Sequence, residues 1–185
     1  MYPLANMPLK SDYLADLESD TRVLIVASTF YTDITHMLLE GALAVLKEAS
    51  CQVTTLVVPG ALEIPILVSI AVKQAQEQGI PYEAVVVLGC VIRGETSHYD
   101  IVITESARAI MDIAVAHALP LGNGILTVET LDQARARAMP KGRASGGESD
   151  LGGRAAAAAL TLCAHKTRLA RELMRAAKQR EFCTA

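Results

Sequence analysis

Short apolar runs and longer amphipathic segments succeed one another along most of the chain. The short runs are rich in β-branched and small apolar residues and predict buried strands at residues 22–28, 51–58, 84–92 and 122–127. The longer segments repeat apolar residues at helical spacing and predict helices at about residues 32–49, 62–78, 99–117, 131–138 and 153–180. Residues 1–20 lack such a period and are expected to form an N-terminal arm, and the glycine-containing stretch 139–151 a loop.

Each of the first three predicted helices has one apolar face that is expected to pack on a sheet. The positions expected on these faces are Leu39, Leu43 and Leu46 with Ala42 and Val45 beside them, then Ile64, Leu67, Val68, Ala71 and Ala75, then Ile103, Ala107, Ile110, Met111 and Ala114. Pro65 falls in the first turn of its helix, where the missing N–H costs little.

Strands that alternate with helices through short connections predict right-handed crossovers and one parallel sheet. The expected fold is α/β: a single-domain three-layer α/β/α sandwich on a four-stranded parallel, flavodoxin-like sheet, formed by residues 21–185. The last helix is long for so small a core. Its surplus apolar face predicts burial against another subunit.

Composition narrows the class of protein further. Apolar residues make up 51% of the chain, with no tryptophan, and the net charge is −3, so nucleic acid is an unexpected partner. The basic residues of the last helix, Lys166, Arg168, Arg171, Arg175, Lys178 and Arg180, are interpreted as a solvated face. No apolar run approaches the roughly 20 residues of a membrane span, and the acidic N-terminal segment does not resemble a signal peptide, so the expected location is the cytoplasm.

Three loops follow the carboxyl ends of successive strands, where open α/β sheets bind ligands. They are Ser28–Tyr31, Pro59–Glu63 and Arg93–His98. Singly, each has an ordinary structural explanation: Phe30 as a core aromatic, Glu63 as an acid at a helix N-terminus, Ser97 or Thr96 as an N-cap, and His98 as a histidine satisfied within the core.

Together the three loops predict a small-molecule site. Phe30 offers a flat face for a planar ring, and the N–H groups around Ala61 with the Glu63 carboxylate suit a polyol or heterocycle. The amides and hydroxyl of Glu95–Thr96 suit a phosphate, with the Glu95 carboxylate pointing away. His98 is the natural acid or base near neutral pH.

Other site chemistries find little support in the sequence. The chain has no phosphate-binding lysine loop and no dinucleotide-binding glycine motif after a strand. The cysteines Cys51, Cys90, Cys163 and Cys183 lack metal-ligand spacing, and no other cluster suggests a metal. A nucleophilic role for Cys90 is disfavoured because an apolar strand would raise its pKa. His36, His117 and His165 lie on predicted helices without a nearby ligand pattern and are interpreted as surface residues.

Two long motifs, VPGALEIP at 58–65 and LGCVIRGETSHYD at 88–100, are supported by NGILTVET at 123–130 and an alanine-rich last helix. In these motifs the chain resembles the 6,7-dimethyl-8-ribityllumazine synthase family over roughly residues 22–175. The resemblance implies a transferase of riboflavin biosynthesis that joins 5-amino-6-(D-ribitylamino)uracil to 3,4-dihydroxy-2-butanone 4-phosphate without metal or organic cofactor.

The resemblance also implies roles for individual residues. Phe30, with Tyr31 beside it, would stack on the pyrimidine; Ala61, Leu62 and Glu63 would hold the ribityl chain; Cys90, Val91 and Ile92 would contact the ring edge; Glu95, Thr96 and Arg137 would bind the phosphate; and His98 would transfer protons. Sites of this family lie between subunits, so Asn123 and Arg137 would come from the neighbour.

The chain departs from the family pattern at two positions. Asn123 stands where a second aromatic is common, and Leu151 stands before Gly152 where a lysine is common. The family forms pentameric rings, some of which build icosahedral shells. Because the loop 139–151 is long and glycine-rich here, we expect a homopentamer or a pair of pentamers and no shell. The alternatives are a non-catalytic flavin- or lumazine-binding protein and a flavodoxin-like flavin mononucleotide carrier or signalling domain.

Overall fold

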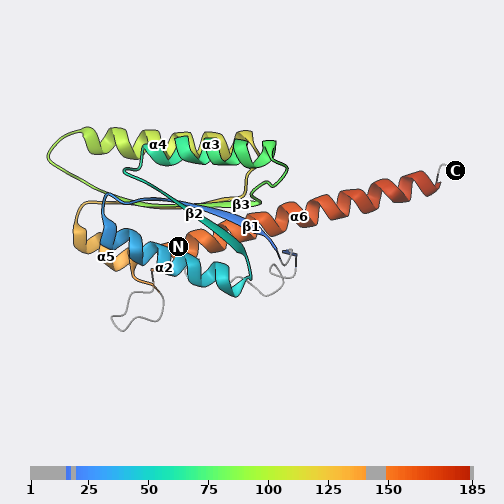
Figure 1. Ribbon diagram of the computed structural model, residues 1–185, viewed down its shortest axis with the longest axis horizontal. Coiled ribbons are helices and arrows are strands. Elements are labelled where there is room, and N and C mark those ends of the chain that lie inside the picture. Colours follow the sequence, from blue (N-terminus) through green and yellow to red (C-terminus); the bar gives the residue numbers. More distant parts are fainter. Residues whose placement is uncertain (1–15, 18–19, 141–148, 184–185) are drawn as a thin grey trace, which may run out of the picture.

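The computed structural model describes residues 16, 17, 20–140 and 149–183 and forms a three-layer α/β/α sandwich (Figure 1). The strands are β1 (Arg22–Ser28), β2 (Gln52–Val58), β3 (Ala84–Ile92) and β4 (Leu121–Val128). All three strand pairings are parallel, in the order β2-β1-β3-β4. The predicted fold class is therefore confirmed. Most of the expected N-terminal arm, and residues 141–148 of the expected loop, lie outside the described residues.

Helices cover both faces of the sheet. The helices α2 (Thr32–Glu48), α5 (Leu131–Ala138) and α6 (Leu151–Cys183) lie on one face, and α3 (Glu63–Glu77) and α4 (His98–Ala116) lie on the other (Figure 1). Strand β3 is buried from both sides, with seven consecutive buried residues from Ala84 to Cys90. This explains why its sequence is a continuous apolar run and does not alternate.

Two predicted helix faces differ from those in the structure. In α2 the buried stripe is Ile34, Leu38, Ala42 and Leu46, and Leu43 is 41% exposed. In α4 only Tyr99, Ser106 and Ile110 are buried, and Met111 is 62% exposed. Both stripes have helical spacing, so the period alone could not say which one meets the sheet.

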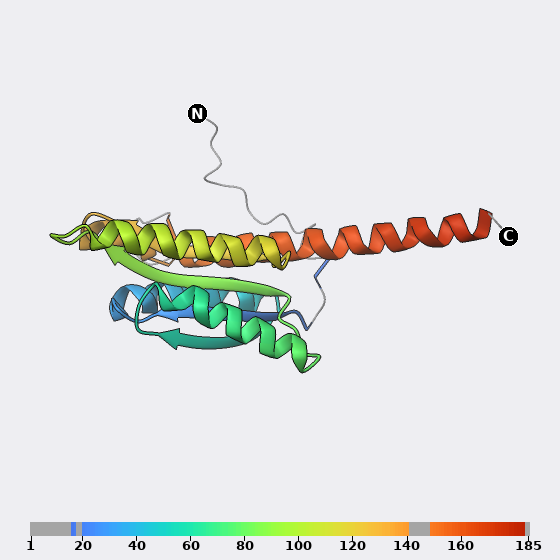
Figure 2. The same cartoon turned by 90° about the horizontal axis from the view of Figure 1, so that it is seen from above.

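Helix α6 is 33 residues long and extends well past the edge of the sheet (Figure 2). Its first half packs on the sheet through Ala155, Ala156, Ala159, Leu160 and Cys163. Its second half is exposed, including the apolar side chains Leu169, Leu173 and Met174. The expected solvated basic face is present, because Lys166, Arg168, Arg171, Arg175, Lys178 and Arg180 are all exposed. No helix among the described residues is long and apolar enough to cross a membrane.

The close contact between α6 and β4 depends on Gly122. A Cβ atom at this position would collide with the backbone carbonyl of Ala155. We expect Gly122→Ala to lower the free energy of unfolding by at least about 1–3 kcal/mol, the usual cost of overpacking. Gly94→Ala is the control, because a Cβ there meets nothing within 4 Å. Urea unfolding measures both, and an unchanged midpoint for Gly122→Ala would contradict this packing.

Candidate active site at the carboxyl edge of the sheet

The carboxyl ends of the strands meet at one edge, as predicted. Ser28 lies beside Val58 in the β1–β2 register, and the Thr29 N–H donates to the Val58 carbonyl at 2.9 Å. The Thr35 hydroxyl donates to the Ser28 carbonyl at 2.6 Å, which ties the start of α2 to the end of β1. The first loop is thus fixed at both ends.

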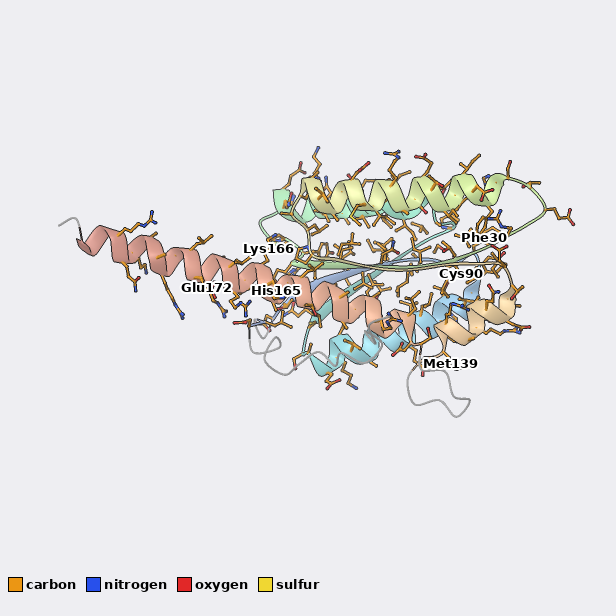
Figure 3. The ribbon with its side chains drawn as sticks, turned by 180° about the vertical axis from the view of Figure 1, so that it is seen from behind. Phe30, Cys90, Met139, His165, Lys166 and Glu172 are labelled. Atoms are coloured by element: carbon orange, nitrogen blue, oxygen red, sulfur yellow. The ribbon has the colours of Figure 1, made fainter. Side chains whose placement is uncertain are left out.

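Phe30 is not a core aromatic. Its side chain is 71% exposed, and its ring meets the ring of Tyr31 edge-to-face with centroids 5.0 Å apart. One flat face of Phe30 therefore remains available for a planar ligand. Figure 3 places Phe30 and Cys90 at the same end of the sheet, far from the projecting part of α6 that carries Glu172.

The second loop turns at Pro59–Gly60 and leads into α3, which begins at Glu63. A Cβ atom at Gly60 would lie 2.8 Å from Oε2 of Glu63, so the carboxylate folds back over this glycine. Pro65 lies in the first turn of α3, as expected. The N–H groups of a first helical turn have no partner within the helix and can donate to a ligand.

The third loop connects β3 to α4. Ser97 occupies the N-cap position, but its side chain makes no capping hydrogen bond, so the N-cap explanation is wrong for Ser97. The Thr96 hydroxyl accepts a long hydrogen bond of 3.4 Å from the His98 N–H. His98 is exposed and begins α4, one residue earlier than predicted, so it is not a histidine satisfied within the core.

The three loops line a cavity of about 420 Å³, within the range of small-molecule sites. The predicted residues that line it are Phe30, Tyr31, Ala61, Leu62, Glu63, Cys90, Val91, Ile92, Thr96 and His98. Tyr99 and Val102 also line it and were not predicted. Because Val102 follows His98 by one helical turn, the spacing on α4 could have identified it.

Glu95, Asn123 and Arg137 do not line the cavity. Glu95 is exposed on the loop. Asn123 is exposed on β4, where its Oδ1 accepts from the Ile125 N–H at 2.9 Å. Arg137 is exposed on α5, which covers the face of the sheet opposite α3 and α4. Its Nη1 donates to the Gln133 carbonyl at 3.1 Å.

The cavity is poor in charge. Among the described residues that line it, Glu63 and His98 are the groups that can carry charge near neutral pH, and neither lysine nor arginine is present. The described residues contain no group of three or more histidine, cysteine or carboxylate side chains placed to hold a metal ion. His36 and His117 are exposed as expected, and His165 is half-buried.

Cys90 lies at the cavity but is only 3% exposed, and desolvation by burial raises its pKa to about 11. Because the Cys90 thiol has a higher pKa in the native state than in the unfolded chain, the unfolded chain loses this proton first as the pH rises. The free energy of unfolding therefore falls between about pH 9 and pH 11. We expect iodoacetamide to modify native Cys90 far more slowly at pH 8 (close to the pKa of a free thiol) than after unfolding in urea. Mass spectrometry of Cys90 peptides measures the two rates, and equal rates would contradict its burial.

The sequence model of the 6,7-dimethyl-8-ribityllumazine synthase family matches residues 20–167. The chain belongs to this family. It is 54% identical over 153 residues to 6,7-dimethyl-8-ribityllumazine synthase 1 of Rhodopseudomonas palustris. This alignment covers 83% of this chain and 90% of that protein. It is 56% identical over 147 residues to the 6,7-dimethyl-8-ribityllumazine synthase of Azorhizobium caulinodans, with 80% and 87% covered.

The family match includes all three loops of the cavity and ends at residue 167. The neighbouring Lys166 lies near the point where α6 leaves the sheet (Figure 3). The lumazine synthase family thus accounts for the sandwich and the cavity. The projecting part of α6 lies beyond the residues that the family model matches.

Proposed function

We propose that the protein condenses 5-amino-6-(D-ribitylamino)uracil with 3,4-dihydroxy-2-butanone 4-phosphate to 6,7-dimethyl-8-ribityllumazine, phosphate and water. The main support is the cavity itself, in which an exposed aromatic ring, the first turn of α3 and the Thr96–His98 segment converge in a lumazine synthase family member. Nothing in the comparisons favours a binding protein without turnover, and membership of this family argues against a flavin mononucleotide carrier.

The pyrimidine half of the cavity would hold the ribitylaminouracil. Phe30, next to Tyr31, would stack on the ring, and the backbone of Cys90, Val91 and Ile92 would contact its edge. Ala61, Leu62 and Glu63 would bind the ribityl hydroxyls, since free helical N–H groups and a carboxylate supply both donors and acceptors.

The butanone phosphate would lie near the start of α4. Glu95 and Thr96 would contribute backbone N–H groups and a hydroxyl, with the Glu95 carboxylate directed away. The cavity contains no arginine or lysine among its described lining residues, so a neighbouring subunit would supply the cation through Arg137, with Asn123 beside the pyrimidine. The site would then be complete only between two subunits.

The chemistry requires proton transfer and orientation, with no cofactor. The ring amine attacks the ketone and loses one water to give an imine. Phosphate is then eliminated to give an enol that tautomerises to a carbonyl, and the ribitylamino nitrogen attacks this carbonyl to close the ring with loss of a second water. His98 would move the protons, and well-oriented reactants can account for about 7–11 kcal/mol of the barrier.

Purified protein incubated with both substrates should produce a fluorescent lumazine, and omission of either substrate should abolish the signal. A protein that binds the pyrimidine and forms no product would support the binding-protein alternative. We expect the protein to act in the cytoplasm, where thiols such as those of Cys51 and Cys90 would stay reduced.

We expect the protein to be a homopentamer or a pair of pentamers. Exposed apolar side chains gather on the helices away from the sheet, including Ile66 and Ile70 on α3 and Ile101, Met111 and Val115 on α4. Such surfaces usually mark interfaces. Sedimentation velocity measures the assembly, and either a stable monomer or a closed shell of megadalton size would contradict the prediction.

A further inference from the structure

Arg93 is the first residue after β3 and begins the loop that carries Thr96 and His98. Its backbone N–H donates to the Val128 carbonyl at 3.0 Å, so the main chain still lies beside the end of β4. Its guanidinium group reaches forward to Asp100, with Nη2 3.0 Å from Oδ1 and Nη1 3.3 Å from Oδ2. This bidentate pair closes the loop onto the first turn of α4.

The same guanidinium group also packs on the cavity wall. Its central carbon lies 4.0 Å from the centroid of the Tyr99 ring, within the range of a cation–π contact. Tyr99 is 7% exposed and lines the cavity next to His98. Arg93 therefore contacts the two residues that directly follow His98 in the chain.

A third contact connects Arg93 to the end of β4. Its Nε lies 3.0 Å from Oε2 of Glu129. The Glu129 N–H donates to Oε1 of Gln133 at 3.0 Å, and Thr130 caps α5 by accepting from the Gln133 N–H at 3.2 Å. Through Glu129, Arg93 thus joins the first turn of α4 to the start of α5, the helix that carries Arg137.

Helix α4 has no capping side chain at its N-terminus, so few described contacts fix its first turn. We propose that Arg93 is a positioning residue, which holds the first turn of α4 so that His98 faces the substrates. This inference rests on the proposed function, because it acts through the proton transfer assigned to His98. A lysine could not take over this role, because a single ammonium group cannot form the bidentate pair with Asp100 and stack on the Tyr99 ring at the same time.

The contribution of Arg93 to rate should exceed its contribution to stability. Its ion pairs are partly exposed, with 39% of the Arg93 side chain and 57% of the Asp100 side chain accessible, and such pairs contribute little to the free energy of unfolding. A small displacement of a catalytic group, in contrast, costs a large factor in rate. We expect Arg93→Ala to lower kcat roughly tenfold, with the KM for the pyrimidine nearly unchanged.

Arg108 on α4, the helix that Arg93 is proposed to hold, provides a matched control. Its Nη2 lies 2.7 Å from Oε2 of Glu105, and its Nη1 lies 2.8 Å from Oδ2 of Asp112. Arg108 does not line the cavity. Arg108→Ala should keep the kcat of the unchanged protein, and both variants should keep its urea midpoint. A comparable loss of kcat in Arg108→Ala would overturn the inference. If Arg93→Ala did not fold, Asp100→Asn would remove the same bidentate pair and should give a similar loss of kcat.

The decisive measurement combines Arg93→Ala with His98→Ala. If Arg93 acts through His98, it should change kcat less than twofold in the His98→Ala background (a deviation from additivity expected for coupled groups). A full tenfold loss in that background would overturn the Arg93 inference alone. Full activity of His98→Ala would contradict the proton-transfer role in the proposed function, and with it any action of Arg93 through His98.

Discussion

His98→Ala is expected to slow turnover about 10- to 100-fold and to leave binding of the pyrimidine nearly intact. A positioned acid or base usually contributes about 10²–10⁴-fold, but water can replace it in part here because orientation supplies most of the acceleration. His98 lines the cavity at the start of α4, whereas Phe30 and Glu63 come from other loops, so the loss should fall on kcat. Steady-state kinetics with each substrate varied in turn measures the effect.

His117→Ala is the matched control. His117 is an exposed histidine at the other end of α4, and its removal should leave kcat unchanged. If His98→Ala kept full activity across pH 6–8 (approximate limits that bracket an ordinary histidine pKa), the assignment of proton transfer to His98 would be wrong.

Arg137→Ala is expected to weaken binding of the butanone phosphate roughly 10- to 150-fold and to spare the pyrimidine. A charge-assisted, partly desolvated hydrogen-bonded pair is worth about 1.5–3 kcal/mol. In the single chain Arg137 is exposed, and among the described residues its hydrogen bond goes from Nη1 to the Gln133 carbonyl, so the rest of its guanidinium fork is available to a ligand in the site of a neighbouring subunit. Steady-state kinetics gives the KM for each substrate: the KM for the butanone phosphate should rise, and the KM for the pyrimidine should stay unchanged.

Arg135→Ala tests whether the position of the charge matters. Arg135 is exposed on α5, as Arg137 is, and its Nη1 lies 3.9 Å from Oδ1 of Asp132. Its loss should change the KM for neither substrate. Equal damage to both substrates in Arg137→Ala would mean that Arg137 holds the subunit interface and does not bind phosphate.

The sheet could be predicted from the sequence because its strands have unambiguous signals. Strand β3 is an unbroken apolar run, and each boundary predicted for β1 agrees with the structure. The cavity was predictable for a related reason: parallel strands bring their following loops to one edge, so Phe30, Glu63 and His98 had to converge there.

The helix faces were less predictable. On α4 the sequence offers Ile103, Met111 and other apolar residues, but the single chain buries Ile110 and leaves Met111 and Val115 exposed. If α4 packs against a neighbouring subunit, as we expect, it carries one apolar stripe for the sheet and another for that subunit, and a single helical period cannot tell the two apart. The contact between Arg93 and Glu129 was equally hidden, because it joins two loops that are 36 positions apart in the chain.

We expect each active site to take His98 from one subunit and Arg137 from its neighbour. Co-expression of His98→Ala chains with Arg137→Ala chains tests it directly, because random assortment in a pentamer gives about a quarter of sites both native residues. We predict that mixed pentamers, assayed at low butanone phosphate, recover clearly more activity than the two homopentamers combined. Activity no greater than the average of the two parents would contradict a site shared between subunits.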